Sequence, residues 1–241
     1  MNDLVGELEI LRRPINGAYP FLLGAVAQNM ARAVWPLRED YVTPMAAVAG
    51  SVADRVLAAA VEGRTLVKAY ANNGGDIALY LTPNNYLDAG VIADFSTGGL
   101  TGQVRVDHSM PVRGVATSGW RGRSHSRGIA DAVTVLSTTA AQADAAASII
   151  ANWVNVEHAA IKRVPAKELD PDTDLGTIPV TVAVGPLPFG GRRSAILSGV
   201  NRARGLLDEG SIAGAFITLG DQAATVGAVN TGSLLRGERY I

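Results

Sequence analysis

The feature that most restricts the fold of this chain is one order of segments that occurs twice. Residues 52–81 read VADRVLAAAVEGRTLVKAYANNGGDIALYL, and residues 200–228 read VNRARGLLDEGSIAGAFITLGDQAATVGA. Each has a helix pattern ending in Glu-Gly, an apolar strand, a Gly-Asp turn and a second strand. Such elements bury their apolar faces by packing in layers. The sequence therefore predicts an α+β fold with helices on antiparallel sheet. Duplication of a helix-plus-hairpin unit and chance likeness between Ala/Gly-rich segments both explain the repeat.

The rest of the chain extends this pattern. Helices are predicted over 45–61, 138–154 and 193–210, and Thr138 or Thr139 would cap the second. The turn-rich segment 167–179 is predicted to be a surface connection. Strands are predicted over residues 65–71, 76–81, 90–94, 102–106, 113–118, 130–137, 180–185 and 213–221.

Composition limits the classes of partner. The 241 residues are 48% hydrophobic with a formal net charge of −1, which offers no electrostatic footprint for nucleic acid. We expect a single domain over 1–241, with two similar halves at about 1–137 and 138–241. The absence of cysteine excludes disulfides, thiolate metal sites and cysteine nucleophiles.

The start of the chain carries only a short apolar patch, at residues 21–26. This patch is too short for a signal peptide or a membrane-spanning helix, so we expect a cytoplasmic protein that does not bind membranes. Closely packed Ala and Gly with few charges favour a homodimer.

One candidate binding turn is NNGGD. Gly74 and Gly75 supply the positive φ angles of a tight reversal and let the backbone approach a ligand closely. Asp76 presents a carboxylate that could bind a hydroxyl, an amide or a metal, or act as general acid or base. A plain hairpin, in which Asp76 accepts hydrogen bonds from backbone amides, explains the same residues.

A second candidate is the loop TSGWRGRSHSRG, residues 117–128. Its backbone amides and forked guanidinium donors suit a phosphate or a carboxylate, and a histidine side chain can serve as general acid or base. A solvated basic turn with a structural histidine is the alternative. The candidate ligand-binding residues are Thr117, Ser118, Gly119, Arg121, Arg123 and Arg127, and the candidate acid or base is His125.

A third candidate is a metal site. Asp144 and Ser148 lie four residues apart on a predicted helix, so both oxygens can bind a hard cation such as Mg²⁺. A local hydrogen bond is the alternative. The acidic run DPDTDLG resembles a calcium loop, but Leu175 stands in place of its glycine and Thr181 in place of its bidentate Glu. We therefore reject a calcium site there.

Four blocks follow one another along residues 40–220: AAVAGSVADRVLAAAVEGRTLVKAYANNGGDIALYL, GVATSG, GIADAVTVLS and ADAAASIIAN. Together they resemble the ApbE-like superfamily and, within it, the UPF0280 family. The characterised members of the superfamily are FAD:protein FMN transferases. The resemblance therefore implies FAD and Mg²⁺ as cofactors, and attachment of FMN to a Thr or Ser of a partner protein.

The resemblance also implies roles for single residues. The Gly-Gly-Asp block falls on residues 74–76, the Ala-Thr-Ser-Gly block on 116–119, and the metal-associated block on Ala143, Asp144, Ala147 and Ser148, where Ser replaces Thr. The chain departs from the transferases at two places. Their Ala-Lys-Gly lysine is replaced around Gly50, and their His-x-x-Asp-Pro-x-Thr-Gly stretch is missing, which leaves His125 as its candidate replacement. The segment DFSTGGL, residues 94–100, is similar to the flavin-attachment target, but its last two residues break the pattern and we interpret it as a turn.

These observations favour a small-molecule enzyme on an ApbE-like scaffold. We expect it to bind an anionic ligand or a flavin-like nucleotide between NNGGD and TSGWRGRSHS, with His125 or Asp76 as acid or base. An active FMN transferase that needs FAD and Mg²⁺ is one alternative. A non-catalytic flavin- or metabolite-binding protein is the other.

Overall fold

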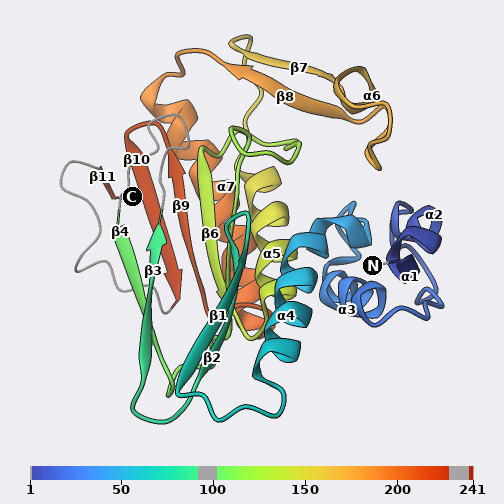
Figure 1. Ribbon diagram of the computed structural model, residues 1–241. Helices are drawn as coiled ribbons and strands as arrows, with labels where there is room; N and C mark the ends of the chain where they lie inside the picture. Colours follow the sequence, from blue (N-terminus) through green and yellow to red (C-terminus); the bar gives the residue numbers. More distant parts are fainter. Residues whose placement is uncertain (1, 92–101, 228–238, 241) are drawn as a thin grey trace.

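A seven-stranded sheet forms the centre of the molecule (Figure 1). The computed structural model describes residues 2–91, 102–227 and 239–240. Within them the strand order is β1-β2-β5-β6-β9-β10-β11, and neighbouring strands are antiparallel except β10 and β11. The strands are β1 (Lys68–Asn73), β2 (Asp76–Leu81), β5 (Gly114–Ser118), β6 (Ala132–Ser137), β9 (Gly214–Leu219), β10 (Gln222–Gly227) and β11 (Arg239–Tyr240). With the helices described next, this confirms the predicted α+β class.

The long helices α4 (Val48–Val61), α5 (Ala140–Trp153) and α7 (Phe189–Asp208) cover one face of the sheet. α3 (Ala25–Val34) packs against α4 and α5. The short helices of the N-terminal part are α1 (Asn2–Gly6), α2 (Leu8–Leu11) and the 3-10 turns η1 (Trp35–Leu37) and η2 (Pro44–Ala47). α5 lies against β5 and β6, and most of its buried side chains are alanine. Such small side chains let helix and sheet approach closely, so a chain with 5% aromatic residues still builds a dense core.

The other face of the sheet is covered by a hairpin of β3 (Tyr86–Val91) and β4 (Gly102–Asp107). Val104 and Val106 of this hairpin belong to the same buried cluster as Leu136 and Phe216 of the sheet. Strands β6 and β9 are consequently buried on both faces. A separate arm of β7 (Ile161–Pro165), α6 (Ala166–Leu169) and β8 (Pro179–Val184) lies at the top of Figure 1.

The two helix-plus-hairpin segments form equivalent local structures. α4 precedes the β1–β2 hairpin, and α7 precedes the β9–β10 hairpin. Gly63 and Gly210 follow the two helices with φ of +68° and +73°. The two turns carry Gly74 (φ +72°) with Gly75 (φ +119°), and Gly220 (φ +60°). Because only glycine adopts these angles at little cost, the shared glycines explain the shared shape.

The structure corrects several predicted boundaries. The first predicted helix, 45–61, begins as the 3-10 turn η2 and is α-helical only from Val48. The second is capped by Thr139, whose hydroxyl accepts a hydrogen bond from the Gln142 backbone N–H, and not by Thr138. The third begins at Phe189 rather than at 193.

Some elements have no counterpart among the predictions, and one prediction cannot be placed. Helices α1, α2 and α3 and strand β7 are absent from the predicted set. Strand β3 begins at Tyr86, before the predicted strand 90–94. The segment 94–100, interpreted as a turn, lies outside the described residues.

By length and hydropathy, the run Pro44–Val61 could cross a membrane, and it is the one such run in the described part of the chain. It is divided between η2 and α4, and α4 packs against α5, β1 and β2. Core helices pass the same test of length and hydropathy. In the structure, 33% of this run is buried.

Gly50 marks a close approach of α4 and α5. A Cβ built at Gly50 would lie 2.3 Å from the carbonyl oxygen of Ala140 and 2.7 Å from the backbone nitrogen of Ala141. We expect Gly50→Ala to lower the free energy of unfolding by about 1–3 kcal/mol, because the helix backbones must separate. Urea unfolding followed by circular dichroism measures this loss. Gly190→Ala is the control, since no heavy atom lies within 4 Å of its added Cβ. Equal losses in the two variants would contradict the close packing.

Candidate ligand-binding and catalytic site

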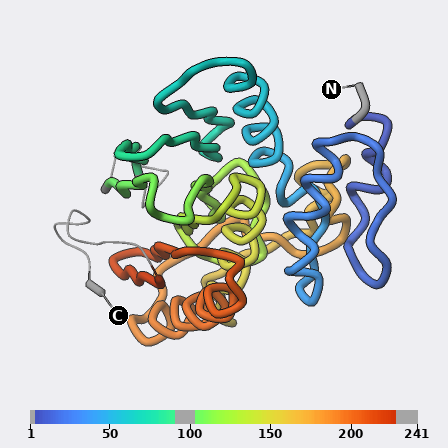
Figure 2. The backbone as a smooth tube through the Cα atoms, turned by 90° about the horizontal axis from the view of Figure 1, so that it is seen from below, coloured from blue at the N-terminus to red at the C-terminus, as the bar shows by residue number. Residues whose placement is uncertain are grey.

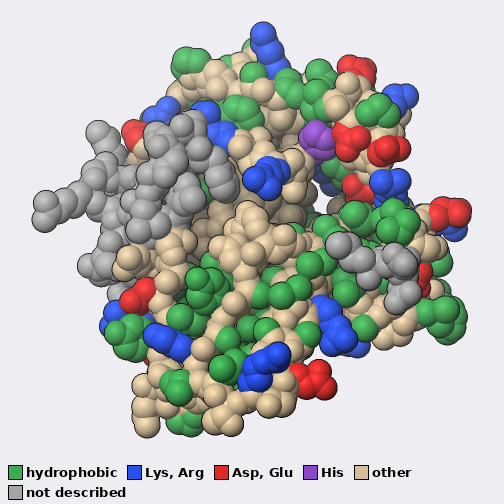
Figure 3. Space-filling model, viewed as in Figure 1, with side chains coloured by type: hydrophobic (Ala, Val, Ile, Leu, Met, Phe, Trp, Pro, Cys, Tyr) green, Lys and Arg blue, Asp and Glu red, His purple; other side chains and the backbone are tan. Residues whose placement is uncertain are grey.

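Two cavities adjoin where the β1–β2 turn and the β5–β6 loop meet α4 and α5. The glycine cavity, of about 520 Å³, is lined by Gly74, Gly119 and Gly122 among others. The acidic cavity, of about 350 Å³, is lined on one side by residues 170–175. Both volumes suit a small molecule. Figure 3 shows a hollow in this face with acidic and basic side chains gathered beside it. Six residues line both cavities: Ala49, Asp76, Arg123, Ser124, Asp144 and Ser148.

Asp76 and Asp144 form a partly buried carboxylate pair at the boundary of the two cavities. Burial raises the pKa of Asp76 to about 7, although a hydrogen bond from the Thr117 backbone opposes this rise. Burial raises the pKa of Asp144 well above its ordinary value, and the nearby charge of Asp76 adds to the rise, although backbone hydrogen bonds from Gly50 and Ala49 oppose it. Two carboxyl groups in this setting retain a proton, or attract a cation, near neutral pH.

Contacts between α4 and α5 place Asp144. The Gly50 backbone N–H donates to Asp144 Oδ2 over 3.0 Å. One turn further along α4, the carboxylate of Asp54 accepts hydrogen bonds from the backbone N–H groups of Ala140 and Ala141, each over 3.0 Å. Asp54 therefore caps α5 from a neighbouring helix. The helix crossing fixes the direction in which Asp144 faces.

The β1–β2 turn places Asp76. The Gly75 backbone N–H donates to Asn72 Oδ1 over 2.9 Å, which closes the turn. The prediction that Gly74 and Gly75 supply positive φ angles is confirmed. Gly74 lines the glycine cavity, whereas Gly75 lines neither of the two cavities.

The end of β5 supplies another wall of the glycine cavity, through Thr117, Ser118 and Gly119. The hydroxyl groups of Thr117 and Thr134 lie 2.9 Å apart on neighbouring strands. A Cβ at Gly119 would lie 2.4 Å from the carbonyl oxygen of Asp131. Only glycine therefore lets this part of the loop pack against the start of β6.

The loop between β5 and β6 has an anchored end and an open end. The Arg127 backbone N–H and the Ser126 hydroxyl donate to Asn152 Oδ1 over 2.8 and 3.3 Å. The Ser126 carbonyl accepts a hydrogen bond from the Thr181 N–H over 2.8 Å. Ser126 is buried, whereas residues 121–124 are exposed. The open end forms the rim between the two cavities.

The three arginines of this loop have different environments. Arg121 Nε donates to Asp131 Oδ1 over 2.9 Å, so part of its charge is already paired. The guanidinium carbon of Arg127 lies 5.9 Å from the centre of the Tyr41 ring. Arg123 is exposed and has no ion pair or hydrogen bond with the residues that the structure describes. Arg123 is therefore the guanidinium most available to an anionic ligand.

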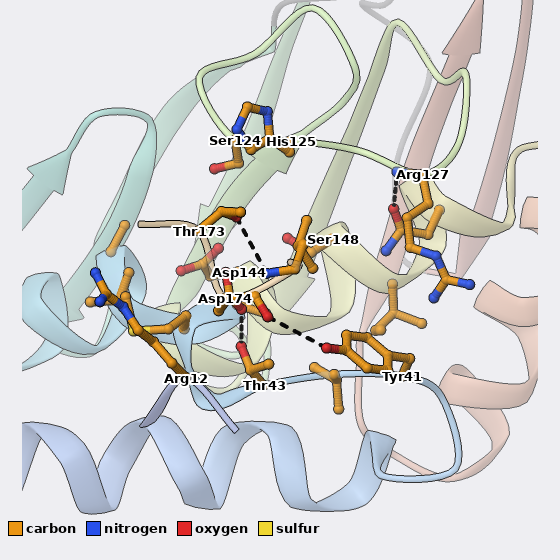
Figure 4. A pocket seen from close by; sticks show the side chains of 18 of the residues that line it. Arg12, Tyr41, Thr43, Ser124, His125, Arg127, Asp144, Ser148, Thr173 and Asp174 are labelled. Atoms are coloured by element: carbon orange, nitrogen blue, oxygen red, sulfur yellow. Dashed lines mark hydrogen bonds between the residues drawn. The ribbon is translucent and has the colours of Figure 1, made fainter. Parts of the chain in front are cut away.

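His125 lies half-buried at the rim of the acidic cavity. Figure 4 shows His125 and Ser124 on the loop, across the cavity from Tyr41 and Thr43. Across the described ranges, no side chain or backbone group forms a hydrogen bond with the His125 ring. Its two nitrogens are therefore available to a ligand.

One wall of the acidic cavity comes from the segment predicted to be a surface connection. Residues 170–175 lie beside the N-terminal part of the chain, as Figures 2 and 4 show. The Thr43 hydroxyl donates to the Asp174 carboxylate, and the Tyr41 hydroxyl donates to the Asp174 carbonyl oxygen over 3.5 Å. The segment is thus part of the candidate site, not merely a connection.

Several residues of this cavity are not predicted from the sequence. They are Arg12, Tyr41, Thr43, Asp170, Asp172, Thr173 and Asp174. The acidic run of residues 170–174 is the one sequence signal for them. Its rejection as a calcium loop gives no reason to expect that it lines a cavity. No local pattern marks the N-terminal residues, because their position depends on a tertiary contact.

Asp76, Asp144 and Ser148 suit a hard divalent cation. The described residues contain no group of three or more His, Cys, Asp or Glu side chains that could hold a metal. Mg²⁺ needs only one or two carboxylates, because water and phosphate oxygens complete its octahedron. No basic side chain of the described residues contributes to the pKa of either carboxyl group. When the pair loses its protons, its negative charge has no basic partner among these residues, and a divalent ion would balance it.

Comparison with known proteins identifies relatives of this chain. A protein-family model described as AbpE bacteria matches residues 1–229. A UPF0280 protein of Methanopyrus kandleri is 38% identical over 141 residues, which are 57% of this chain and 54% of the relative. A UPF0280 protein of Methanothermobacter thermautotrophicus is 38% identical over 131 residues, 54% of this chain and 48% of the relative. The chain spans about half the length of the curated relatives it matches.

Proposed function

We propose that this chain, which belongs to the ApbE-like family described as AbpE bacteria, is a small-molecule enzyme. Its proposed ligand carries phosphate, as a flavin nucleotide does. The observation that carries the proposal is the Asp76–Asp144 carboxylate pair between two cavities, below a rim that bears Arg123, for which the described residues supply no ion pair or hydrogen bond. Perturbed carboxyl groups in a cleft are typical of functional sites.

The glycine cavity is the proposed position of the phosphate. The exposed guanidinium of Arg123 and the hydroxyl of Ser124 lie at its rim. Gly74, Gly119 and Gly122 form parts of its wall without side chains, so phosphate oxygens can approach the backbone. Forked guanidinium donors bind phosphate oxygens strongly.

The carboxylate pair is the proposed position of Mg²⁺. Asp144 and Ser148 would hold the ion from α5, and Asp76 would hold it from the start of β2. When bound, the ion would neutralise the charge of the phosphate and polarise it. Hydrogen bonds from the Gly50 and Ala49 backbones orient Asp144 for this role.

Asp76 is the proposed acid or base. Its pKa of about 7 lies near neutral pH, where a carboxyl group can both accept and return a proton. His125 is the second candidate, since it lines the acidic cavity and its ring carries no hydrogen bond from the described residues. Rates measured for Asp76→Asn and His125→Gln would separate the two roles.

FMN transfer has less support than a different reaction in the same pocket. Neither the glycine cavity nor the acidic cavity is lined by a lysine of the described chain. Around Gly50 the resemblance places the replaced transferase lysine, and at Gly50 itself an added Cβ would collide with the Ala140 backbone. The position therefore cannot carry a side chain without moving α5.

Calorimetric titration with FAD, and separately with FMN, tests the proposal. We expect binding in the presence of Mg²⁺ and much weaker binding in EDTA. Absorbance and mass of any molecule released on denaturation would identify a copurified ligand. Failure of FAD, FMN and AMP to bind with Mg²⁺ present would refute the proposed ligand class. Release of AMP from FAD would instead establish transferase chemistry, and binding without turnover of any substrate would favour a carrier.

Replacing Arg123 by Ala is expected to weaken FMN binding about 10- to 100-fold, because a charge-assisted contact with phosphate is lost. Riboflavin, which has no phosphate, should bind both proteins alike. Arg193→Ala is the matched control, since Arg193 is exposed on α7 and lines neither cavity. If Arg123→Ala binds FMN as the wild type does, the phosphate does not contact this side chain.

A further inference from the structure

A third cavity, here called the tryptophan cavity, lies beyond the acidic cavity and has a volume of about 720 Å³. Trp153, the last residue of α5, forms part of its wall. Tyr41, Arg127 and Asn152 line both the tryptophan cavity and the acidic cavity. Figure 4 shows Tyr41 and Arg127 at one side of the acidic cavity. A ligand that extends past Arg127 would enter the tryptophan cavity.

Trp153 is held as a rigid platform. Its side chain is 46% exposed, although tryptophan is usually well buried. The indole Nε1–H donates to Asp40 Oδ1 over 2.7 Å. Asp40 Oδ2 in turn accepts hydrogen bonds from Arg202 over 2.9 and 3.1 Å, and this ion pair is mostly buried. An exposed indole fixed by a buried ion pair loses little conformational entropy when a ring stacks on it.

The polar groups of the cavity suit a neutral ring with both donors and acceptors. Arg127 and Arg163 contribute positive charge, and Glu39 and Glu157 contribute negative charge, while Asp40 is neutralised by Arg202. The charges therefore balance, which disfavours a second phosphate.

Two side-chain amides add hydrogen-bonding groups to this wall. Asn152 and Asn155 use their side-chain oxygens to accept hydrogen bonds from Arg127 and Arg163 respectively. Within the described ranges their NH₂ groups have no partner. They can therefore donate to acceptors on a ring edge.

We infer that the tryptophan cavity binds the planar heteroaromatic ring of a nucleotide, stacked on Trp153, with the phosphate of the same molecule on the far side of the acidic cavity, in the glycine cavity. This inference rests on the proposed function for the phosphate only. The ring subsite depends on Trp153 and the amides around it, and it can be tested with ligands that have no phosphate.

The test uses the variant Trp35→Phe/Trp120→Phe, in which Trp153 is the remaining tryptophan of the three in the chain. Adenosine and riboflavin are the probes, and they distinguish a purine ring from an isoalloxazine ring. We expect one of the two probes to bind saturably. Binding of either probe should change the fluorescence emission of Trp153, and binding of riboflavin should also quench its own flavin emission. Trp153→Ala should weaken that binding about ten-fold or more, because stacking on an aromatic side chain is lost.

A second variant avoids any change at Trp153. Ser198→Leu places a larger side chain in the same cavity from α7 and should also weaken binding of the ring about ten-fold. Ser194→Leu is its control, since Ser194 is exposed on the same helix and lines none of the three cavities. Circular dichroism and thermal unfolding establish that each variant is folded.

The outcomes separate this inference from the proposed function. Adenosine or riboflavin binding that survives Asp144→Asn, but not Trp153→Ala, supports the ring subsite whether or not Mg²⁺ binds. Mg²⁺-dependent binding of FAD that is equal in the wild type, Trp153→Ala and Ser198→Leu would overturn the ring subsite and leave the proposed function standing. Failure of both probes to bind would overturn the ring subsite as well.

Discussion

Asp144→Asn is expected to weaken Mg²⁺ binding about 100-fold or more, because a metal-binding carboxylate becomes a neutral amide. In the wild type, millimolar Mg²⁺ should raise the thermal unfolding temperature, since an ion that binds only the folded state stabilises it by mass action. The same addition of Mg²⁺ should leave the thermal unfolding temperature of Asp144→Asn almost unchanged. FMN affinity should fall in parallel in the variant, whereas affinity for riboflavin should not.

The control for this variant is Asp172→Asn. Asp172 also lines the acidic cavity, but it is exposed and lies outside the Asp76–Asp144 pair. Its replacement should leave the response to Mg²⁺ intact. If both variants lose the response, general negative charge attracts the ion, and the pair is not its binding site. If the wild type shows no response to Mg²⁺, the proposed metal site is wrong.

The carboxylate pair should also make stability depend on pH. The pKa of Asp76 is about 7 in the folded state against an ordinary value of 3.8. Below about pH 4 the carboxyl group is protonated in both folded and unfolded chains, and its contribution to stability is fully present. As pH rises toward 7 and beyond, the unfolded chain loses its proton first, so the folded state is progressively disfavoured. Asp144, whose pKa is also raised, acts in the same direction.

Asp76→Asn should therefore be more stable than the wild type above pH 7 when Mg²⁺ is removed with EDTA, by about 1–2 kcal/mol. The difference in free energy of unfolding should shrink toward zero as pH falls to about 4. Urea unfolding at a series of pH values measures it.

Asp107→Asn provides a control of opposite sign for this pH series. Hydrogen bonds from Ser109 lower the pKa of Asp107. The wild type therefore gains stability from this group as pH rises, and Asp107→Asn becomes less stable relative to the wild type. A constant difference between Asp76→Asn and the wild type across the series would show that Asp76 keeps its ordinary pKa.

The repeated parts of the fold are predictable because their signals are local. Glycines that end a helix or close a two-residue turn act through their own φ angles, and Gly63, Gly74 and Gly210 all adopt positive values. The start of α7 is harder to predict, since Gly190 and Gly191 are poor helix formers that only the tertiary packing holds in a helix. Short elements such as α1 and α2 lack enough residues for a periodic pattern.

The sequence identifies individual residues of the candidate site, but not the interaction between them. Asp76 and Asp144 are each identifiable from the residues beside them, yet Asp76 lies on strand β2 and Asp144 on helix α5. Their shared burial, and hence their raised pKa values, arises only when α4, α5 and β2 pack together. For the same reason Trp153 and Asp40, which lie far apart in the chain, show no relation in the sequence.

The anchored end and the open end of the β5–β6 loop should tolerate mutation to different degrees. Changes at Ser126 or Gly128 disturb buried hydrogen bonds and close backbone packing, so selection for folding would act on them directly. Residues 121–124 are exposed, and Arg123 has no partner in the described structure. Ligand preference can therefore diversify among relatives through this short stretch while the scaffold beneath it stays intact.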